Sequence, residues 1–193
     1  MVVGVTGGIG SGKTWVSSLF QDLGIPIYIS DIEAKKLMHS DVKTKNSIIQ
    51  LFGKEVYVDN QLNRALISEK VFVDKSLLNE LNSIVHPAVA LHFDQWYKAQ
   101  NTPFVIKESA IIFELNAQNK YDKIILVTAP EKVKLQRIQE RDAHVSVTAI
   151  KQRMNNQWGD EKKIPLSDYV IENTDKHKTL LRVKEIYKFL INN

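Results

Sequence analysis

The chain has 193 residues, 44% of them hydrophobic and 25% charged, as in an ordinary globular protein with a sizeable core. Its net charge of +4 comes from 21 lysines and five arginines against 22 acidic residues, and the scattered lysines argue against nucleic-acid binding. The absence of cysteine excludes disulfides, thiolate metal sites and a cysteine nucleophile, and it suits a reducing cytoplasm. No apolar run approaches the roughly 18 residues of a membrane span. We expect a cytoplasmic α/β protein without membrane contact, either a monomer or a small homo-oligomer.

A glycine-rich segment near the start of the chain is the strongest motif. Gly7–Thr14 matches the pattern G-x-x-x-x-G-K-[ST] of a phosphate-binding P-loop. An apolar strand pattern precedes it at residues 2–5, and helical spacing follows it as far as Gly24. The alternative, a glycine-rich turn beside an incidental lysine, does not explain this order of strand, loop and helix. The expected ATP-binding residues here are Gly8, Ile9, Gly10, Ser11, Gly12, Lys13, Thr14 and Trp15.

The residue types of the motif indicate how it would bind a nucleotide. Glycine amides and the N-terminus of the following helix surround phosphate groups with N–H donors. Lys13 can reach the β- and γ-phosphates as a catalytic cation, and the hydroxyl of Thr14 can bind Mg²⁺, the expected cofactor. The segment therefore predicts a protein that binds a nucleoside triphosphate with magnesium.

Further elements follow in an alternating order. A second strand pattern covers residues 25–29, and residues 32–100 show helical spacing, with one helix expected to begin at Pro87. Later strand patterns lie at 104–106, 124–127 and 169–171, and a closing helix spans 180–190.

This order predicts a P-loop α/β fold, with three αβα layers and a parallel, five-stranded sheet. The long helical stretch between the second and third strands indicates an insertion for a second substrate. The expected parts are a nucleotide-binding core (1–31, 101–136 and 164–193), a helical acceptor-binding insertion (32–100) and an arginine-bearing lid (137–163).

Two acidic residues follow predicted strands at the edge where such sheets bind ligands. Asp31 follows the second strand, where a carboxylate can accept the proton of an attacking hydroxyl. Its alternative role is that of a helix N-cap. Glu108 ends the third strand, where it can position Mg²⁺ or face the acceptor, or else form a surface ion pair. We expect both to converge with the P-loop on one cleft.

Three of the five arginines, Arg137, Arg141 and Arg153, lie in one stretch. Arg137 and Arg141 are four residues apart and share one helix face, which could close over the triphosphate and match its charge. The alternative is a solvated, arginine-rich helix. His86, which precedes Pro87, has no neighbours with metal-ligand spacing and by itself predicts only a turn residue.

Nearly the whole chain resembles the dephospho-coenzyme A kinase family. The segment Val5–Lys13 is similar to that family's particular P-loop. The other similar segments occur in the family's order: Ser30-Asp31 with Ala34, Leu62-Asn63-Arg64, Leu81–Pro87, Ala110–Glu114, Arg153 with Gln157, Lys163, and Asp168–Asn173.

The resemblance implies phosphoryl transfer from ATP to the ribose 3′-hydroxyl of dephospho-coenzyme A, the last step of coenzyme A synthesis. Asp31 would be the base or orienting group for that hydroxyl. Arg64 and His86 would lie near the acceptor, and Asn173 near the adenine of ATP. The lid would carry or adjoin Arg137, Arg141 and Arg153, with Arg153 among the ATP-binding residues.

Three positions depart from the family pattern. Ile29 replaces the first aspartate of an Asp-x-Asp pair, Trp15 stands where threonine is common, and Ala110 replaces proline. None removes an indispensable group, so we expect activity. The alternatives are another small-molecule or nucleoside monophosphate kinase and, from a different class, a nucleotide-dependent switch or nucleic-acid-binding ATPase.

Overall fold

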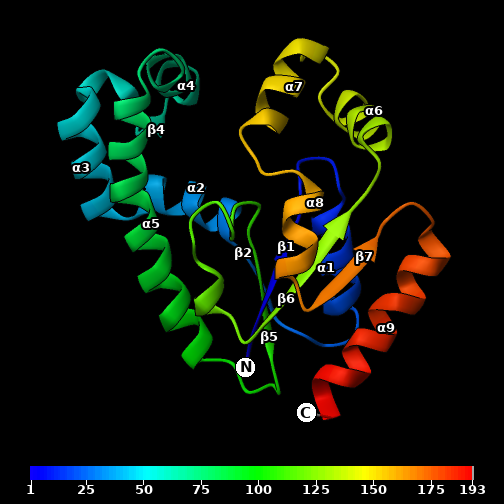
Figure 1. The fold of residues 1–193 in the computed structure, drawn as a ribbon. Coiled ribbons are helices and arrows are strands. Elements are labelled where there is room, and N and C mark those ends of the chain that lie inside the picture. Colours follow the sequence, from blue (N-terminus) through cyan, green and yellow to red (C-terminus); the bar gives the residue numbers. More distant parts are fainter. Residues whose placement is uncertain (193) are drawn as a thin grey trace. The chain divides into compact units, whose positions relative to one another are not determined.

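A computed structural model describes residues 1–192, apart from the side chain of Lys75, and divides the chain into two compact units (Figure 1). The first unit consists of Met1–Ile29 and the segment from Gln100 onward, and the second consists of Ser30–Ala99. The roles expected for residues 32–100 and 137–163, acceptor binding and lid closure, stay predictions.

The first unit is built on a five-stranded parallel sheet with strand order β2-β5-β1-β6-β7, which confirms the predicted fold class. Glu108 of β5 lies beside Val5 of β1 on one side and Ile29 of β2 on the other. These three residues therefore mark the carboxyl edge of the sheet. The strands are β1 (Val2–Thr6), β2 (Ile27–Ile29), β5 (Val105–Glu108), β6 (Lys123–Thr128) and β7 (Tyr169–Glu172).

Helices α1 and α9 pack together over one face of this sheet (Figure 1). Val16 of α1, Ile186 of α9 and Val5 of β1 are fully buried in one cluster. Burying each such side chain contributes about 1.5–3 kcal/mol, so this cluster fixes the start of α1 to the end of β1. The bounds are α1 (Lys13–Gln21) and α9 (Lys176–Asn192).

The other face of the sheet carries a smaller cluster. Ile112 and Phe113, in the segment after β5, pack with Ile124 of β6, and Tyr121 lies against them. Because neighbouring residues of a strand point to opposite faces, Ile124 faces this cluster while the next residue faces the larger one. The remaining elements of the unit are η2 (Gln118–Lys120), α6 (Glu131–Arg141), α7 (Val147–Asn155), α8 (Asp160–Lys163) and η3 (Ile164–Leu166).

The second unit is mainly helical, as expected, with α2, α3 and α4 packed against the long helix α5. It also contains a β-hairpin that the sequence reading missed. The hairpin turns through Asp59 and Asn60, which have φ angles of 48° and 64°. Asp and Asn tolerate this left-handed region, so an Asp-Asn pair directly after the apolar stretch Val56–Val58 was the available signal. The elements are α2 (Ser30–Ser40), α3 (Val42–Phe52), η1 (Lys54–Val56), β3 (Tyr57–Val58), β4 (Gln61–Leu62), α4 (Arg64–Val73) and α5 (Lys75–Lys98).

The expectation that Pro87 begins a helix was wrong, because α5 runs through it without a break. Proline inside a helix removes one hydrogen bond and crowds the preceding turn, at a cost of about 3 kcal/mol. Packing of α5 against three other helices offsets that cost. His86 is consequently a helical residue and not a turn residue. Among the described residues, no helix has both the length and the apolar character needed to cross a membrane.

Candidate functional site

The P-loop is shaped by close approach of neighbouring backbone. Gly7 has φ 151° and Gly12 has φ 90°, conformations that L-residues with a side chain rarely adopt. A Cβ atom at Gly7 would collide with the carbonyl of Val127 in β6, and one at Gly12 would collide with the side-chain amide of Asn173. The loop then enters α1, whose first turn carries no acidic side chain to neutralise the positive end of the helix.

The first two residues of α1 make side-chain hydrogen bonds where the loop joins the helix. The ammonium of Lys13 donates to the carbonyl of Gly8 at 3.3 Å. The hydroxyl of Thr14 donates to Oε1 of Glu108 at 3.2 Å. Glu108 is only 6% exposed, so the alternative of a surface ion pair was wrong. A hydroxyl and a carboxylate are oxygen ligands of the kind that Mg²⁺ prefers, and their proximity fits a magnesium site.

Arg137 and Asn173 hold the P-loop through the backbone carbonyl of Ser11. The guanidinium of Arg137 donates to the carbonyls of Ser11 at 3.2 Å and Asn173 at 2.8 Å. The side-chain amide of Asn173 donates to the same Ser11 carbonyl at 2.8 Å, and its oxygen accepts from Thr179 at 3.4 Å. Asn173 is 3% exposed. These contacts indicate that both residues position the loop, whereas the expected contact of Asn173 with adenine stays a prediction.

The other two arginines of the expected lid are exposed, and among the described residues neither is hydrogen-bonded to the P-loop. Arg141, the last residue of α6, pairs with its neighbour Asp142 at 2.9 Å. Hydrogen bonding between these side chains raises the pKa of Arg141 and lowers the pKa of Asp142. Arg153 lies in the last turn of α7. Their expected roles at the triphosphate stay predictions.

The segment between α7 and α8 is held by side-chain hydrogen bonds to the P-loop and to Glu114. The sequence analysis gave the residues that make these bonds no role of their own. Oε1 of Gln157 accepts from the backbone N–H of Ile9 at 2.8 Å, directly on the P-loop. Glu114 accepts from the backbone N–H of Trp158 at 2.8 Å and forms an ion pair with the fully buried Lys163, also at 2.8 Å. The resemblance included Gln157, Glu114 and Lys163, but only as matching positions.

A second fastening pairs Lys134 of α6 with Asp160 of α8 at 2.5 Å. Gly8, Lys134, Gln157 and Asp160 all line a cavity of about 530 Å³. The sequence analysis missed Lys134 and Asp160. The only signal was that Lys134 lies on the α6 face that also carries the buried Ile138.

Trp15 packs its side chain against the large hydrophobic cluster of the first unit. Its backbone carbonyl accepts a hydrogen bond from the hydroxyl of Ser18 at 2.8 Å. The core therefore accommodates Trp15 in place of the family's threonine. The expected contact of Trp15 with ATP stays a prediction.

In the second unit, Asp31 and Arg64 both lie at helix starts, and both are exposed. Asp31 lies in the first turn of α2, which begins one residue earlier at Ser30, so the N-cap alternative was wrong. Arg64 is the first residue of α4, because Asn63 caps that helix by accepting from the backbone N–H of Leu66. His86 lies in the middle of α5.

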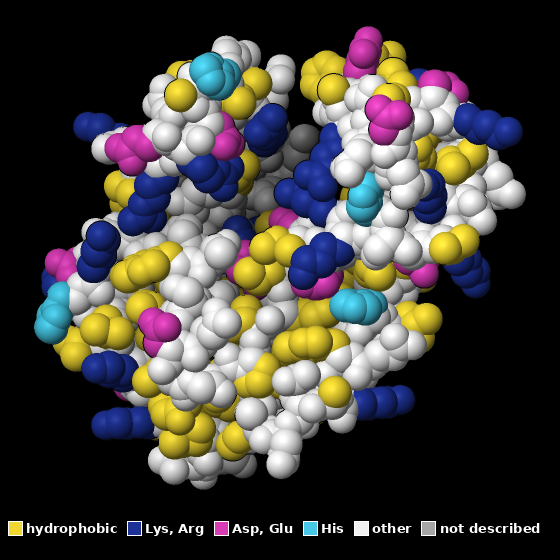
Figure 2. Space-filling view, turned by 180° about the vertical axis from the view of Figure 1, so that it is seen from behind, with side chains coloured by type: hydrophobic (Ala, Val, Ile, Leu, Met, Phe, Trp, Pro, Cys, Tyr) yellow, Lys and Arg dark blue, Asp and Glu magenta, His cyan; other side chains and the backbone are white. Residues whose placement is uncertain are grey.

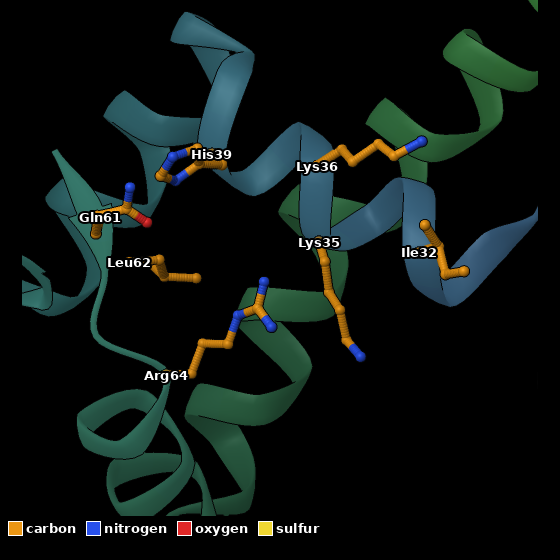
Figure 3. Close-up of a pocket in the computed structure, with 7 residues that line it drawn as sticks. All are labelled: Ile32, Lys35, Lys36, His39, Gln61, Leu62 and Arg64. Atoms are coloured by element: carbon orange, nitrogen blue, oxygen red, sulfur yellow. The ribbon is translucent and has the colours of Figure 1, made fainter.

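A basic pocket of about 400 Å³ lies in the second unit between α2, β4 and the start of α4. Figure 3 shows the side chains of Lys35 and Arg64 extending toward the same space, while that of Lys36, which also lines the pocket, extends in another direction. Lys36 pairs instead with Glu33 at 2.7 Å, and neither Lys35 nor Arg64 forms an ion pair with another described residue. His39 completes the basic lining. This pocket is suited to an anionic group.

Comparisons with known proteins agree with one another. The family model described as dephospho-CoA kinase matches residues 1–179. The dephospho-CoA kinase of Bacteroides fragilis is 35% identical over 189 residues, which cover 97% of this chain and 92% of that protein. The structure of TT1252 from Thermus thermophilus has a TM-score of 0.89 at 27% identity, covering 98% of this chain and 96% of that one. A dephospho-CoA kinase from Campylobacter jejuni shares the fold, with a TM-score of 0.70, 24% identity and coverage of 99% and 97%.

The contacts of Asn173 predict how its removal acts. Asn173→Ala leaves the Ser11 carbonyl with one fewer donor, so the affinities for ATP and for inorganic tripolyphosphate should fall by a similar factor, about tenfold. Isothermal titration calorimetry with both ligands measures this. If only the ATP affinity falls and tripolyphosphate binds as before, Asn173 contacts the base instead.

Proposed function

Because the chain belongs to the dephospho-CoA kinase family, we propose that it transfers the γ-phosphoryl group of ATP to the ribose 3′-hydroxyl of dephospho-coenzyme A. The observation that carries the donor half is the P-loop: the ammonium of Lys13 lies at the loop's own Gly8 carbonyl, and the hydroxyl of Thr14 bonds to Glu108 at the carboxyl edge of the sheet. The product is coenzyme A, and ADP leaves.

On the donor side, the P-loop amides and Lys13 bind and orient the β- and γ-phosphates. Arg137 and Asn173 keep that loop in shape through the Ser11 carbonyl. Thr14 and Glu108 would hold Mg²⁺, which neutralises phosphate charge when it is bound. Arg141 and Arg153 would approach the triphosphate from α6 and α7.

On the acceptor side, we assign Asp31 to the attacking hydroxyl. The 3′-oxygen forms a bond to the γ-phosphorus while the bond from that phosphorus to the bridging oxygen of ADP breaks. The carboxylate of Asp31 takes the hydroxyl proton or fixes its direction. Its exposure at the start of α2 supports this role, since the carboxylate is accessible to a substrate hydroxyl. With Ile29 in place of the family's other aspartate, Asp31 acts alone.

The basic pocket supports binding of the acceptor's anionic part. Dephospho-coenzyme A carries a diphosphate, and arginine offers phosphate a planar pair of N–H donors while lysine offers a point charge. Arg64 and Lys35 extend into one space and have no carboxylate partner among the described residues. We therefore assign these two residues to the diphosphate, with His86 and Glu108 kept as further acceptor contacts.

The surface charge gives less support to the alternative of a nucleic-acid-binding ATPase. Figure 2 shows Lys and Arg side chains in separate groups on the face drawn, interspersed with Asp and Glu. Nucleic-acid sites gather basic residues into a patch or stripe. The proposal also keeps the cytoplasmic location that the cysteine-free sequence favours.

An acceptor comparison tests the proposed function directly. The purified protein with Mg²⁺ and ATP should convert dephospho-coenzyme A to coenzyme A, with ADP release followed by a coupled assay and the product identified by mass. Turnover on nucleoside monophosphates or shikimate instead, without coenzyme A formation, would contradict the assignment.

Replacing Asp31 separates its chemical role from a structural one. Asp31→Asn keeps the size of the side chain but removes its basicity, so kcat should fall by about 10²–10⁴ while the Kd for ATP stays unchanged. Glu33→Gln, in the same turn of α2, is the matched control and should keep kcat. An unchanged kcat in Asp31→Asn would return this residue to a role in stabilising the helix start.

The two orientations of the adjacent lysines give a test of the basic pocket. Lys35→Met and Arg64→Met should each raise the KM for dephospho-coenzyme A about tenfold or more, with little change in the KM for ATP. Lys36→Met is the control, because that side chain lines the same pocket but extends in another direction and already pairs with Glu33. Equal effects of all three substitutions would show a general charge effect and not a diphosphate site.

A further inference from the structure

Lys134 is a buried cation beside the P-loop with no role so far in phosphate binding. The residue is 8% exposed, whereas Lys132 on the same helix is exposed. Its backbone is fixed against the loop, because a Cβ at Gly10 would collide with the Lys134 carbonyl. Its ammonium lies against Gly8, 3.4 Å from where a Cβ of that glycine would be. A positive charge is thus held rigidly at the first half of the loop.

Two hydrogen-bond donors at this end of the loop are already bonded to side-chain oxygens of the protein. A carboxylate oxygen of Asp160 binds the Lys134 ammonium at 2.5 Å, and the amide oxygen of Gln157 binds the N–H of Ile9 at 2.8 Å. A cation and a backbone N–H of a P-loop are the groups that phosphate oxygens bind. The Asp160 carboxylate therefore satisfies Lys134 in the way that a phosphate group would.

The partners of this ion pair differ in their freedom to separate. The side chain of Lys134 is 10% exposed and rises from a helix packed on the loop, while that of Asp160 is 20% exposed. Asp160 is the first residue of the four-residue helix α8, next to Gly159. Both side chains line the same cavity, but the more exposed carboxylate of Asp160 regains water more readily when it turns outward, whereas the less exposed lysine would bear a desolvation cost if it were left unpaired. An incoming anion can thus replace Asp160 without leaving Lys134 unpaired.

We propose that Lys134 is a phosphate-binding residue of this chain, and that Asp160 competes with the triphosphate for its ammonium. The inference rests on the proposed function only in taking ATP as the donor. It assigns Lys134 to the γ-phosphate end of the loop, near Gly8 and Ile9. The contrasting possibility is that the pair only fastens α8 to α6.

Opposite effects of the two partners on anion binding distinguish these roles. Lys134→Met should weaken binding of inorganic tripolyphosphate and of ATP by roughly tenfold to a hundredfold, as for loss of a charged hydrogen bond. Asp160→Asn should strengthen both several-fold, because the competitor is weakened while the side-chain size is kept. The double variant should bind like Lys134→Met. All affinities are measured by calorimetry without an acceptor, so they do not depend on which acceptor is phosphorylated.

Two controls account for charge and folding. Lys132→Met, on the exposed side of α6, should leave the affinities unchanged, and so should Glu161→Gln, which lines the same cavity without pairing with Lys134. If Glu161→Gln strengthens binding as much as Asp160→Asn, the effect is general electrostatics and the proposal fails. It also fails if Asp160→Asn weakens binding or leaves it unchanged, a result that decides the matter even if Lys134→Met does not fold.

Discussion

The carbonyl of Ser11 is the point on which the nucleotide half of the molecule depends. It accepts from the guanidinium of Arg137 in α6 and from the amide of Asn173 just after β7. Two charged or polar donors on one buried carbonyl fix the path of the P-loop more tightly than the loop's own hydrogen bonds can. Since the amides of that loop bind phosphate only in one geometry, the last strand and α6 take part in donor binding without touching the nucleotide.

The parts of the site that the sequence predicted are those set by a local pattern of residues. The glycines, Lys13 and Thr14 were predicted from an uninterrupted motif, and Glu108 was predicted from its place at the end of a strand. The parallel sheet followed from the alternation of strand and helix patterns. The β-hairpin at Asp59 and Asn60 was missed because its strands are only two residues long and the surrounding spacing is helical. The unbroken α5 was missed because tertiary packing outweighs the local cost of Pro87.

Side chains that act through distant partners were the harder part. The sequence matched Gln157 only as a family position, offered for Lys134 only its place on the face of Ile138, and gave no signal for Asp160. Their importance arises when α6 and the segment before α8 are brought against Gly8 and Ile9, more than a hundred residues earlier in the chain. The clustering of arginines in one stretch did not predict which of them contacts the P-loop. Arg137 bonds to the loop, while Arg141 bonds to its own neighbour.

The strand order has a consequence for biosynthesis. Strand β1 lies at the centre of the sheet, and its partners β5 and β6 begin only at residues 105 and 123. The Ser11–Asn173 bond closes a separation of 162 residues. During synthesis β1 therefore stays without its two sheet partners until residues 105–128 have been made, whereas the helical unit of residues 30–99 is complete before the first of those partners begins. Co-translational assembly is thus expected to complete the helical unit first and the phosphate-binding loop last.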